Sequence, residues 1–159
     1  IYDGTDAVML SGESAAGKFP VESVNMMAKI AEETEQHLSG HLLERQRDIK
    51  SRVTISSTIA HMSVRAAEEL EASCIIAATM TGTTARYLSN FRPPCVIAGV
   101  TPNEWVMRRM QLYWGVYPVK IREITTTDDL ILSAVEKTGR KSFVKDGDVC
   151  IMTAGIAEK

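Results

Sequence analysis

The sequence lacks the features on which several functional classes depend. Its three cysteines, Cys74, Cys95 and Cys150, match the spacing of neither a disulfide framework nor a zinc site. No apolar run approaches the roughly 20 residues of a membrane-spanning helix, and no secretory signal is found. We therefore expect reduced thiols in a cytoplasmic protein that does not have a membrane as its partner.

An excess of charge of either sign is also missing. The chain carries 18 basic and 20 acidic residues, which gives a net charge of −2. A protein that binds nucleic acid usually presents a strongly basic surface to the phosphate backbone. Nucleic acid is therefore not an expected partner.

Signatures of a complete active site are absent too. No Walker glycine loop, no paired nucleophile and base, and no set of four metal ligands can be assembled from the sequence. His37 and His41 have the spacing of a metal-binding pair on a helix, but Gly40 lies between them, and surface histidines are the better interpretation. We therefore expect this chain to hold no catalytic residue and no metal-binding residue.

What the sequence does contain is a regular alternation of strand and helix patterns. Four apolar runs predict strands at Ser73–Ala78, Val96–Val100, Val116–Val119 and Asp148–Thr153. Between them, helices are predicted at Thr83–Asn90, Asn103–Leu112 and Thr127–Lys137, with Asn103 and Thr127 as N-caps. This order predicts an α/β fold in which a mostly parallel sheet has helices on both faces.

A further helix is predicted to begin at Thr54, before this alternation. Ser56 or Ser57 is its expected N-cap. Spacing by three and four residues defines the face that we expect to be buried, with Ile59, Met62, Ala66 and Leu70.

The first part of the chain indicates a separate strand, loop and helix. Ala7–Leu10 predicts a short buried strand, which Ser11–Ser14 interrupts. Pro20 suits the first turn of a helix that should end near Gly40. The expected buried face of this helix carries Val21, Val24, Ala28 and Ala31. Charged residues dominate the stretch 42–52, so we predict domain boundaries at 1–40, 41–53 (a connector) and 54–159.

The most distinctive stretch is the turn after the strand Ser73–Ala78. It reads Thr79, Met80, Thr81, Gly82, Thr83 and Thr84. Backbone N–H groups and the positive end of a helix dipole meet at such a turn, and the hydroxyls add donors, so the turn suits a phosphate. Threonine is also a good helix cap, and the stretch alone favours neither interpretation. Its position beyond the carboxyl end of a parallel strand favours a ligand site.

Four blocks of sequence, in this order, resemble pyruvate kinase. They are Asp3–Gly17 with Pro20–Val24, Thr79–Ala85 with Phe91–Pro93, Trp114–Pro118, and Asp146–Val149. The resemblance covers essentially the whole chain. It implies the last strand and helix of a (β/α)8 barrel, followed by a C-terminal regulatory α/β domain that lacks its final strand. Because the chain starts at Ile1 rather than at Met, we expect a fragment, and the form of 123–129 is similar to bacterial members.

The resemblance implies a glycolytic enzyme that transfers phosphoryl from phosphoenolpyruvate to ADP with Mg²⁺ and K⁺. In the family, the catalytic lysine and the metal-binding carboxylates lie on earlier barrel strands, which have no counterpart here. This chain is therefore expected to be inactive alone. Ser11, Gly12 and Glu13 are expected to border the active-site face of the parent enzyme.

The same resemblance implies that Thr79–Thr84 binds the phosphate of an allosteric sugar phosphate, such as fructose 1,6-bisphosphate. The span Thr127–Lys137 holds no arginine for a second phosphate, so a monophosphate is an equal expectation. The family forms tetramers, and we expect a dimer here, because a missing final strand leaves a sheet edge unpaired. The alternative is a stand-alone α/β module that binds a phosphorylated metabolite, although such a module would have no use for the Asp3–Gly17 block.

Overall fold

The computed structural model describes residues 1–2, 4–37, 54–123 and 126–154, and it divides the chain into two compact units. The first unit is Ile1–Asp48 and the second is Ile49–Lys159. The predicted connector, 41–53, lies outside the described residues, so the domain boundaries stay predictions. Within the described ranges, no helix is both long enough and apolar enough to cross a membrane.

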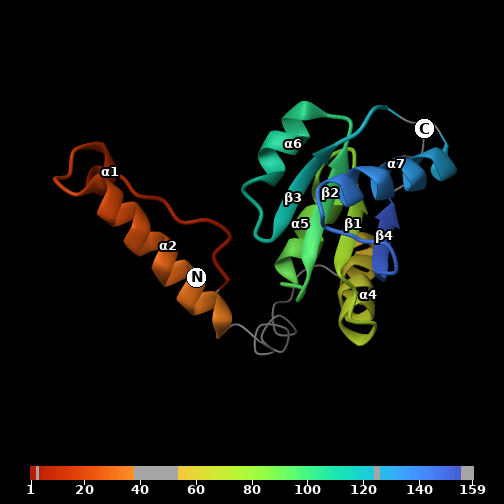
Figure 1. Ribbon diagram of the computed structural model, residues 1–159, viewed down its shortest axis with the longest axis horizontal. Helices are drawn as coiled ribbons and strands as arrows, with labels where there is room; N and C mark the ends of the chain where they lie inside the picture. The colour runs from red at the N-terminus through yellow and green to blue at the C-terminus, as the bar shows by residue number, and fades with distance from the viewer. Residues whose placement is uncertain (3, 38–53, 124–125, 155–159) are drawn as a thin grey trace. The chain divides into compact units, whose positions relative to one another are not determined.

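The second unit is built on a sheet of four parallel strands (Figure 1). The strands are β1 (Cys74–Ala78), β2 (Val96–Thr101), β3 (Val116–Lys120) and β4 (Cys150–Ala154). Their order is β3-β2-β1-β4, so β1 is an inner strand and β4 lies at an edge. Every residue of β1 is buried, as its apolar sequence predicts for a strand covered on both faces. All four predicted strands are confirmed to within about two residues at either end.

Helices cover both faces of this sheet, which confirms the predicted fold class. They are α4 (Ile55–Glu69), α5 (Thr83–Asn90), α6 (Glu104–Met110) and α7 (Thr127–Arg140). The helix α6 packs on one face of the sheet, and α7, which lies between β3 and β4 in the chain, packs on the other. On the α7 side, Cys74 and Ile76 of β1 pack with Ala134 of α7 in one buried cluster. On the opposite side, Gly99 of β2 faces the side chain of Met110 in α6.

The helix caps differ from the prediction in two places. The N-cap of α4 is Thr54 rather than Ser56 or Ser57, and its hydroxyl accepts a hydrogen bond from the backbone N–H of Ser57. Ser57 completes a capping box by accepting from the N–H of Thr54. The N-cap of α7 is Thr126, one residue before the predicted Thr127. In both cases several nearby residues carry a hydroxyl group, and any of them can supply the cap. Asn103 is confirmed as the N-cap of α6.

The buried face of α4 is not the predicted one. Ala60, Ser63, Val64 and Ala67 are buried, whereas Ile59, Met62 and Leu70 are 49%, 65% and 57% exposed. The sequence of α4 carries two apolar stripes, and the prediction chose the one with the larger residues. The helix instead turns its small residues inward, which lets it pack closely against β1 and α5. We call the exposed residues Ile55, Ile59, Met62 and Leu70 the outer stripe of α4.

The first unit contains two helices, α1 (Gly12–Ala15) and α2 (Pro20–Gln36). Pro20 occupies the first turn of α2, as predicted. Ala7–Leu10 does not form the predicted buried strand: it has no regular secondary structure, and Met9 is 83% exposed. A parallel strand exists only beside a hydrogen-bonding neighbour, and the described residues of this unit supply none.

The predicted buried face of α2 is also wrong. No residue of α2 is buried, and Val21 and Val24 are both exposed. A helix buries its apolar stripe only against a second layer, and among the described residues of this unit α2 has only α1 and the N-terminal segment beside it. The predicted helix end, near Gly40, lies outside the described residues.

Candidate functional site

The Thr79–Thr84 turn leaves β1 at the carboxyl edge of the sheet, as the sequence predicts. The N–H of Thr79 still belongs to the sheet and donates to the carbonyl of Val100 at 2.9 Å. The hydroxyl of Thr79 accepts a hydrogen bond from the N–H of Gly82, also at 2.9 Å, and closes the turn from inside. Thr79 is buried, so its side chain shapes the turn and is not presented to solvent.

Gly82 is the residue at which the turn becomes the helix. It is the N-cap of α5 with a φ of +79°, in the left-handed region, where glycine has no steric penalty. A glycine has no side chain with which to cap the helix, so the N–H groups in the first turn of α5 receive no cap from this residue. This geometry weakens the interpretation of the turn as a side-chain helix cap.

The remaining predicted site residues surround this helix start. The hydroxyl oxygens of Thr81 and Thr83 lie 2.9 Å apart and form a hydrogen bond with each other. Thr81 is exposed, and Thr83 and Thr84 are half-buried. The side chain of Met80 is half-exposed. The turn therefore presents hydroxyl groups at its outer surface, beside the positive end of the α5 dipole.

A cation from another element lies against this turn. Nη2 of Arg109, in α6, donates a hydrogen bond to the carbonyl oxygen of Thr81. The same helix packs against the turn, because a Cβ added to Gly82 would lie 3.3 Å from both Val106 and Met110. Guanidinium has five N–H donors, so Arg109 can hold the turn and still donate to an anion.

Sequence reasoning did not assign Arg109 to this site. Arg108 and Arg109 are adjacent and chemically identical, and both can equally well meet an anion or cover a surface. In the structure they differ, because Arg108 turns away to an ion pair with Glu104. Hydrogen bonds from Lys120 and Arg108 lower the pKa of Glu104. The strand order could have identified Arg109 as a site residue. The turn after β1 and the helix after β2 are neighbours only if β1 and β2 pair.

Ser11, Gly12 and Glu13 lie in the first unit, where they begin α1. The N–H of Ser11 donates to the carboxylate of Glu13 at 3.1 Å. Backbone hydrogen bonds from Glu13 itself and from Ser11 lower the pKa of the Glu13 carboxyl group. Within this unit the three residues form a local capping arrangement, and their predicted place beside an active site stays a prediction.

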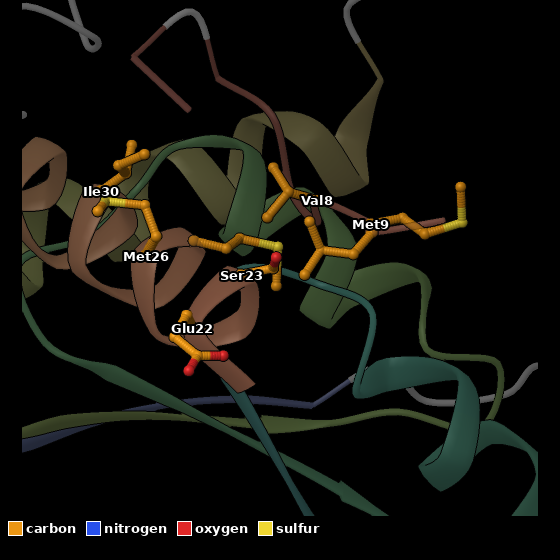
Figure 2. Close-up of a pocket in the computed structure, with 8 residues that line it drawn as sticks. Val8, Met9, Glu22, Ser23, Met26 and Ile30 are labelled. Atoms are coloured by element: carbon orange, nitrogen blue, oxygen red, sulfur yellow. The ribbon is translucent and has the colours of Figure 1, made fainter. Parts of the chain in front are cut away.

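An open hollow lies between α2 and the N-terminal segment of the first unit (Figure 2). Val8 and Met9 line it from the segment, and Met26 and Ile30 line it from α2. Its remaining lining residues are Leu10, Glu22, Ser23 and Met27. This lining is mainly apolar and offers no arrangement for acid–base or nucleophilic chemistry. In the described part of the chain, no group of three or more His, Cys, Asp or Glu side chains could hold a metal ion.

Comparison with known proteins gives one consistent family. The family model described as "Pyruvate kinase, alpha/beta domain" matches residues 57–159. The chain is 42% identical over 156 residues to a pyruvate kinase of Clostridium acetobutylicum, covering 98% of this chain and 33% of the relative. It is 44% identical over 158 residues to pyruvate kinase 2 of Synechocystis, covering 99% of this chain and 26% of the relative.

A solved structure agrees with these sequences. A crystal structure of a pyruvate kinase from Cryptosporidium parvum superposes on 96% of this chain, and on 31% of its own, with a TM-score of 0.86 and 31% sequence identity. The chain thus spans about a third, or less, of the length of the relatives that it matches.

Proposed function

This chain belongs to the pyruvate kinase family, whose C-terminal portion it matches, and from this premise we propose its activity and its ligand. The whole enzyme transfers phosphoryl from phosphoenolpyruvate to ADP, in glycolysis and in the cytoplasm. The second unit is its allosteric domain, and the turn Thr79–Thr84 binds the phosphate group of a sugar phosphate. The observation that carries the ligand proposal is the Arg109 guanidinium on the turn, beside the start of α5.

The chemistry of the turn suits a phosphate group. Phosphate oxygens accept hydrogen bonds, and the turn offers the hydroxyls of Thr81 and Thr83 together with the first N–H groups of α5. Arg109 adds a positive charge and further N–H donors on the same side. Arg109 is the arginine whose side chain the structure places on the turn, and the span Thr127–Lys137 holds no arginine for a second phosphate. We therefore propose that one phosphate group is bound here, from a bisphosphate or from a monophosphate.

Magnesium and potassium belong to the proposal for the whole enzyme and not to this chain. The described residues offer no group of three side chains of the kind that Mg²⁺ binds. We assign the metal ions and the transfer step to the parts of the relatives that this chain does not match.

We predict that Arg109→Gln weakens the binding of fructose 1,6-bisphosphate, glucose 6-phosphate or inorganic phosphate. The loss should be about fivefold, because an exposed ionic hydrogen bond contributes on the order of 1 kcal/mol. The matched control is Arg108→Gln, which removes the neighbouring charge but not the contact with the turn. Calorimetric titration gives the affinities, and NMR locates the perturbation. If no phosphate compound perturbs Thr81 or Gly82, the proposed site is wrong; equal losses in the two variants would reject only the role of Arg109.

We predict no pyruvate formation by the isolated chain. A coupled assay with phosphoenolpyruvate, ADP, Mg²⁺ and K⁺ should give the rate of the blank, while a full-length pyruvate kinase in the same cuvette gives turnover. The reason is that the family resemblance places the catalytic lysine and the metal-binding carboxylates on barrel strands that this chain does not match, and its described residues offer no metal-binding group. Appreciable pyruvate formation would contradict the proposal that the transfer step needs the rest of the enzyme.

We also propose that the second unit forms a dimer through the outer stripe of α4. The stripe exposes three large apolar side chains on α4 and a fourth, Leu70, at its C-cap. Exposed apolar surface of this kind is typical of an interface. Met62→Lys places a charge at its centre and should shift the chain to a monomer in sedimentation analysis. Leu132→Lys is the control, since Leu132 is equally exposed but lies on α7. A dimer that survives Met62→Lys would place the interface elsewhere.

A stand-alone module that binds a phosphorylated metabolite is the second candidate. The first unit argues against it, because Met9, Phe19, Val21 and Met26 are all more than half exposed. A small soluble module does not usually keep so many large apolar side chains in water. A mass measurement on the natural protein distinguishes the two candidates, because only the first requires a much larger chain.

A further inference from the structure

The three cysteines, which are far apart in sequence, gather at the amino edge of the sheet. Cys74 is the first residue of β1 and Cys150 is the first residue of β4. Cys95 directly precedes β2. Because β1 lies between β2 and β4, Cys74 lies between the other two. All three thiols are free.

Two of these cysteines are direct neighbours across paired strands. Cys74 and Cys150 are Cα partners in the parallel ladder of β1 and β4, which lie side by side in Figure 1. The ladder is closed just before this pair, where the N–H of Ser73 donates to the carbonyl of Val149 at 2.9 Å. Neighbouring strands lie about 4.8 Å apart, and disulfides join Cα atoms that are about 4.4 to 6.8 Å apart.

The side chains of this pair also share one face of the sheet. Partners in register point to the same side, and both thiols belong to the apolar cluster beneath α7. Cys95 differs, because Val96, the residue after it, is the partner of Cys74. Cys95 lies just before β2 and out of register with Cys74, although it also contributes to raising the pKa of the Cys74 thiol.

We propose that Cys74 and Cys150 form an intramolecular disulfide when the protein meets a peroxide, and that this bond ties the edge strand β4 to the inner strand β1. Thiol reductants reverse the oxidation and restore both cysteines. It is independent of the phosphate site, which lies at the other end of β1.

The two cysteines have different parts in this reaction because their exposure differs. Cys150 is half-buried at the start of an edge strand, and a peroxide can reach it. Cys74 is fully buried, and this burial raises the pKa of its thiol to about 12. A protonated, buried thiol is a poor first nucleophile, so Cys150 is oxidised first and Cys74 reacts second.

The reaction is balanced with one peroxide for each disulfide. The Cys150 sulfur attacks one oxygen of hydrogen peroxide, the O–O bond breaks, and hydroxide leaves and takes up the proton that the thiol released. The product is a sulfenic acid. The Cys74 sulfur then attacks the sulfenic sulfur, an S–S bond forms, the S–O bond breaks, and the oxygen leaves as water with the Cys74 proton. Two thiols are oxidised and one peroxide is reduced to two waters.

The test treats the 159-residue chain with hydrogen peroxide, quenches it, and counts thiols in denaturant. The expected count falls from three to one, the mass falls by two hydrogen atoms, and dithiothreitol restores both. Peptide mapping should find Cys74 linked to Cys150. Cys95→Ser should fall from two thiols to none, whereas Cys150→Ser should keep both of its thiols.

Four results would overturn the proposal. They are a constant thiol count, a linked peptide that contains Cys95, a disulfide between two copies on a non-reducing gel, and a mass that rises by oxygen atoms without a linked peptide. The mapping uses the unaltered chain, so it decides the question even if a variant fails to fold.

Discussion

Gly82→Ala is expected to lower the free energy of unfolding and to weaken phosphate binding at the same time. Gly82 has a φ of +79°, and a residue with a Cβ in the left-handed region costs about 1–3 kcal/mol. The added Cβ would also lie 3.3 Å from Val106 and from Met110, which is closer than an ordinary contact. The closure between Thr79 and Gly82 should loosen, and with it the site. Urea unfolding and calorimetric titration measure the two effects.

Gly115→Ala is the matched control for this substitution. Gly115 also has a positive φ, +66°, but an added Cβ would meet nothing within 4 Å. We expect it to cost the backbone strain alone, roughly 1–2 kcal/mol, and to leave phosphate binding unchanged. If the two variants lose the same stability and bind phosphate equally, then the packing of α6 against the turn is irrelevant to the site.

Ile76→Ala is expected to cause the largest loss of stability of any substitution considered, about 2–5 kcal/mol. Ile76 is fully buried in the middle of β1, and its neighbours in the ladder are Ala98 and Met152. Its side chain fills the cluster that joins the sheet to α7, so truncation leaves a cavity inside a close-packed layer. The measurement is the urea midpoint, read by circular dichroism.

The control for Ile76 is Ile131→Ala. Ile131 is the same residue type, but it lies on α7 and is 41% exposed. It should lose less than about 1.5 kcal/mol, because a large part of its side chain stays in water in the folded unit. Equal losses at the two positions would mean that the layer between β1 and α7 is not the core of this unit.

The sequence predicts the four strands well because the pattern that marks each strand is local. Runs such as Ile75–Ala78 and Val96–Val100 are apolar throughout and end at turns, and a strand buried on both faces needs nothing more. The face of α4 was predicted wrongly because two stripes of similar apolarity share one helix. Which stripe turns inward depends on how closely the helix approaches the sheet, and a helical pattern carries no information on that distance.

The candidate site was predictable in part for the same reason. The turn Thr79–Thr84 is contiguous, so its hydroxyls and its place after a strand can be read from the sequence, although its ligand stays a prediction. Arg109 is contributed by another element, and its contact with Thr81 depends on the pairing of β1 with β2. Ala7–Leu10 shows the opposite error: an apolar run predicts a strand, but a strand also needs a neighbour.

The strand order has a consequence for how the second unit folds. The pairing of β1 with β2 closes a short loop. The pairing of β1 with β4 closes a much longer one, which contains β2, α6, β3 and α7. Loop-closure entropy therefore delays β4 most. We expect β4, which pairs with the sheet last, also to separate from it first. Amide hydrogens of β4 should therefore exchange with solvent by partial opening, while those of β1 exchange only on global unfolding.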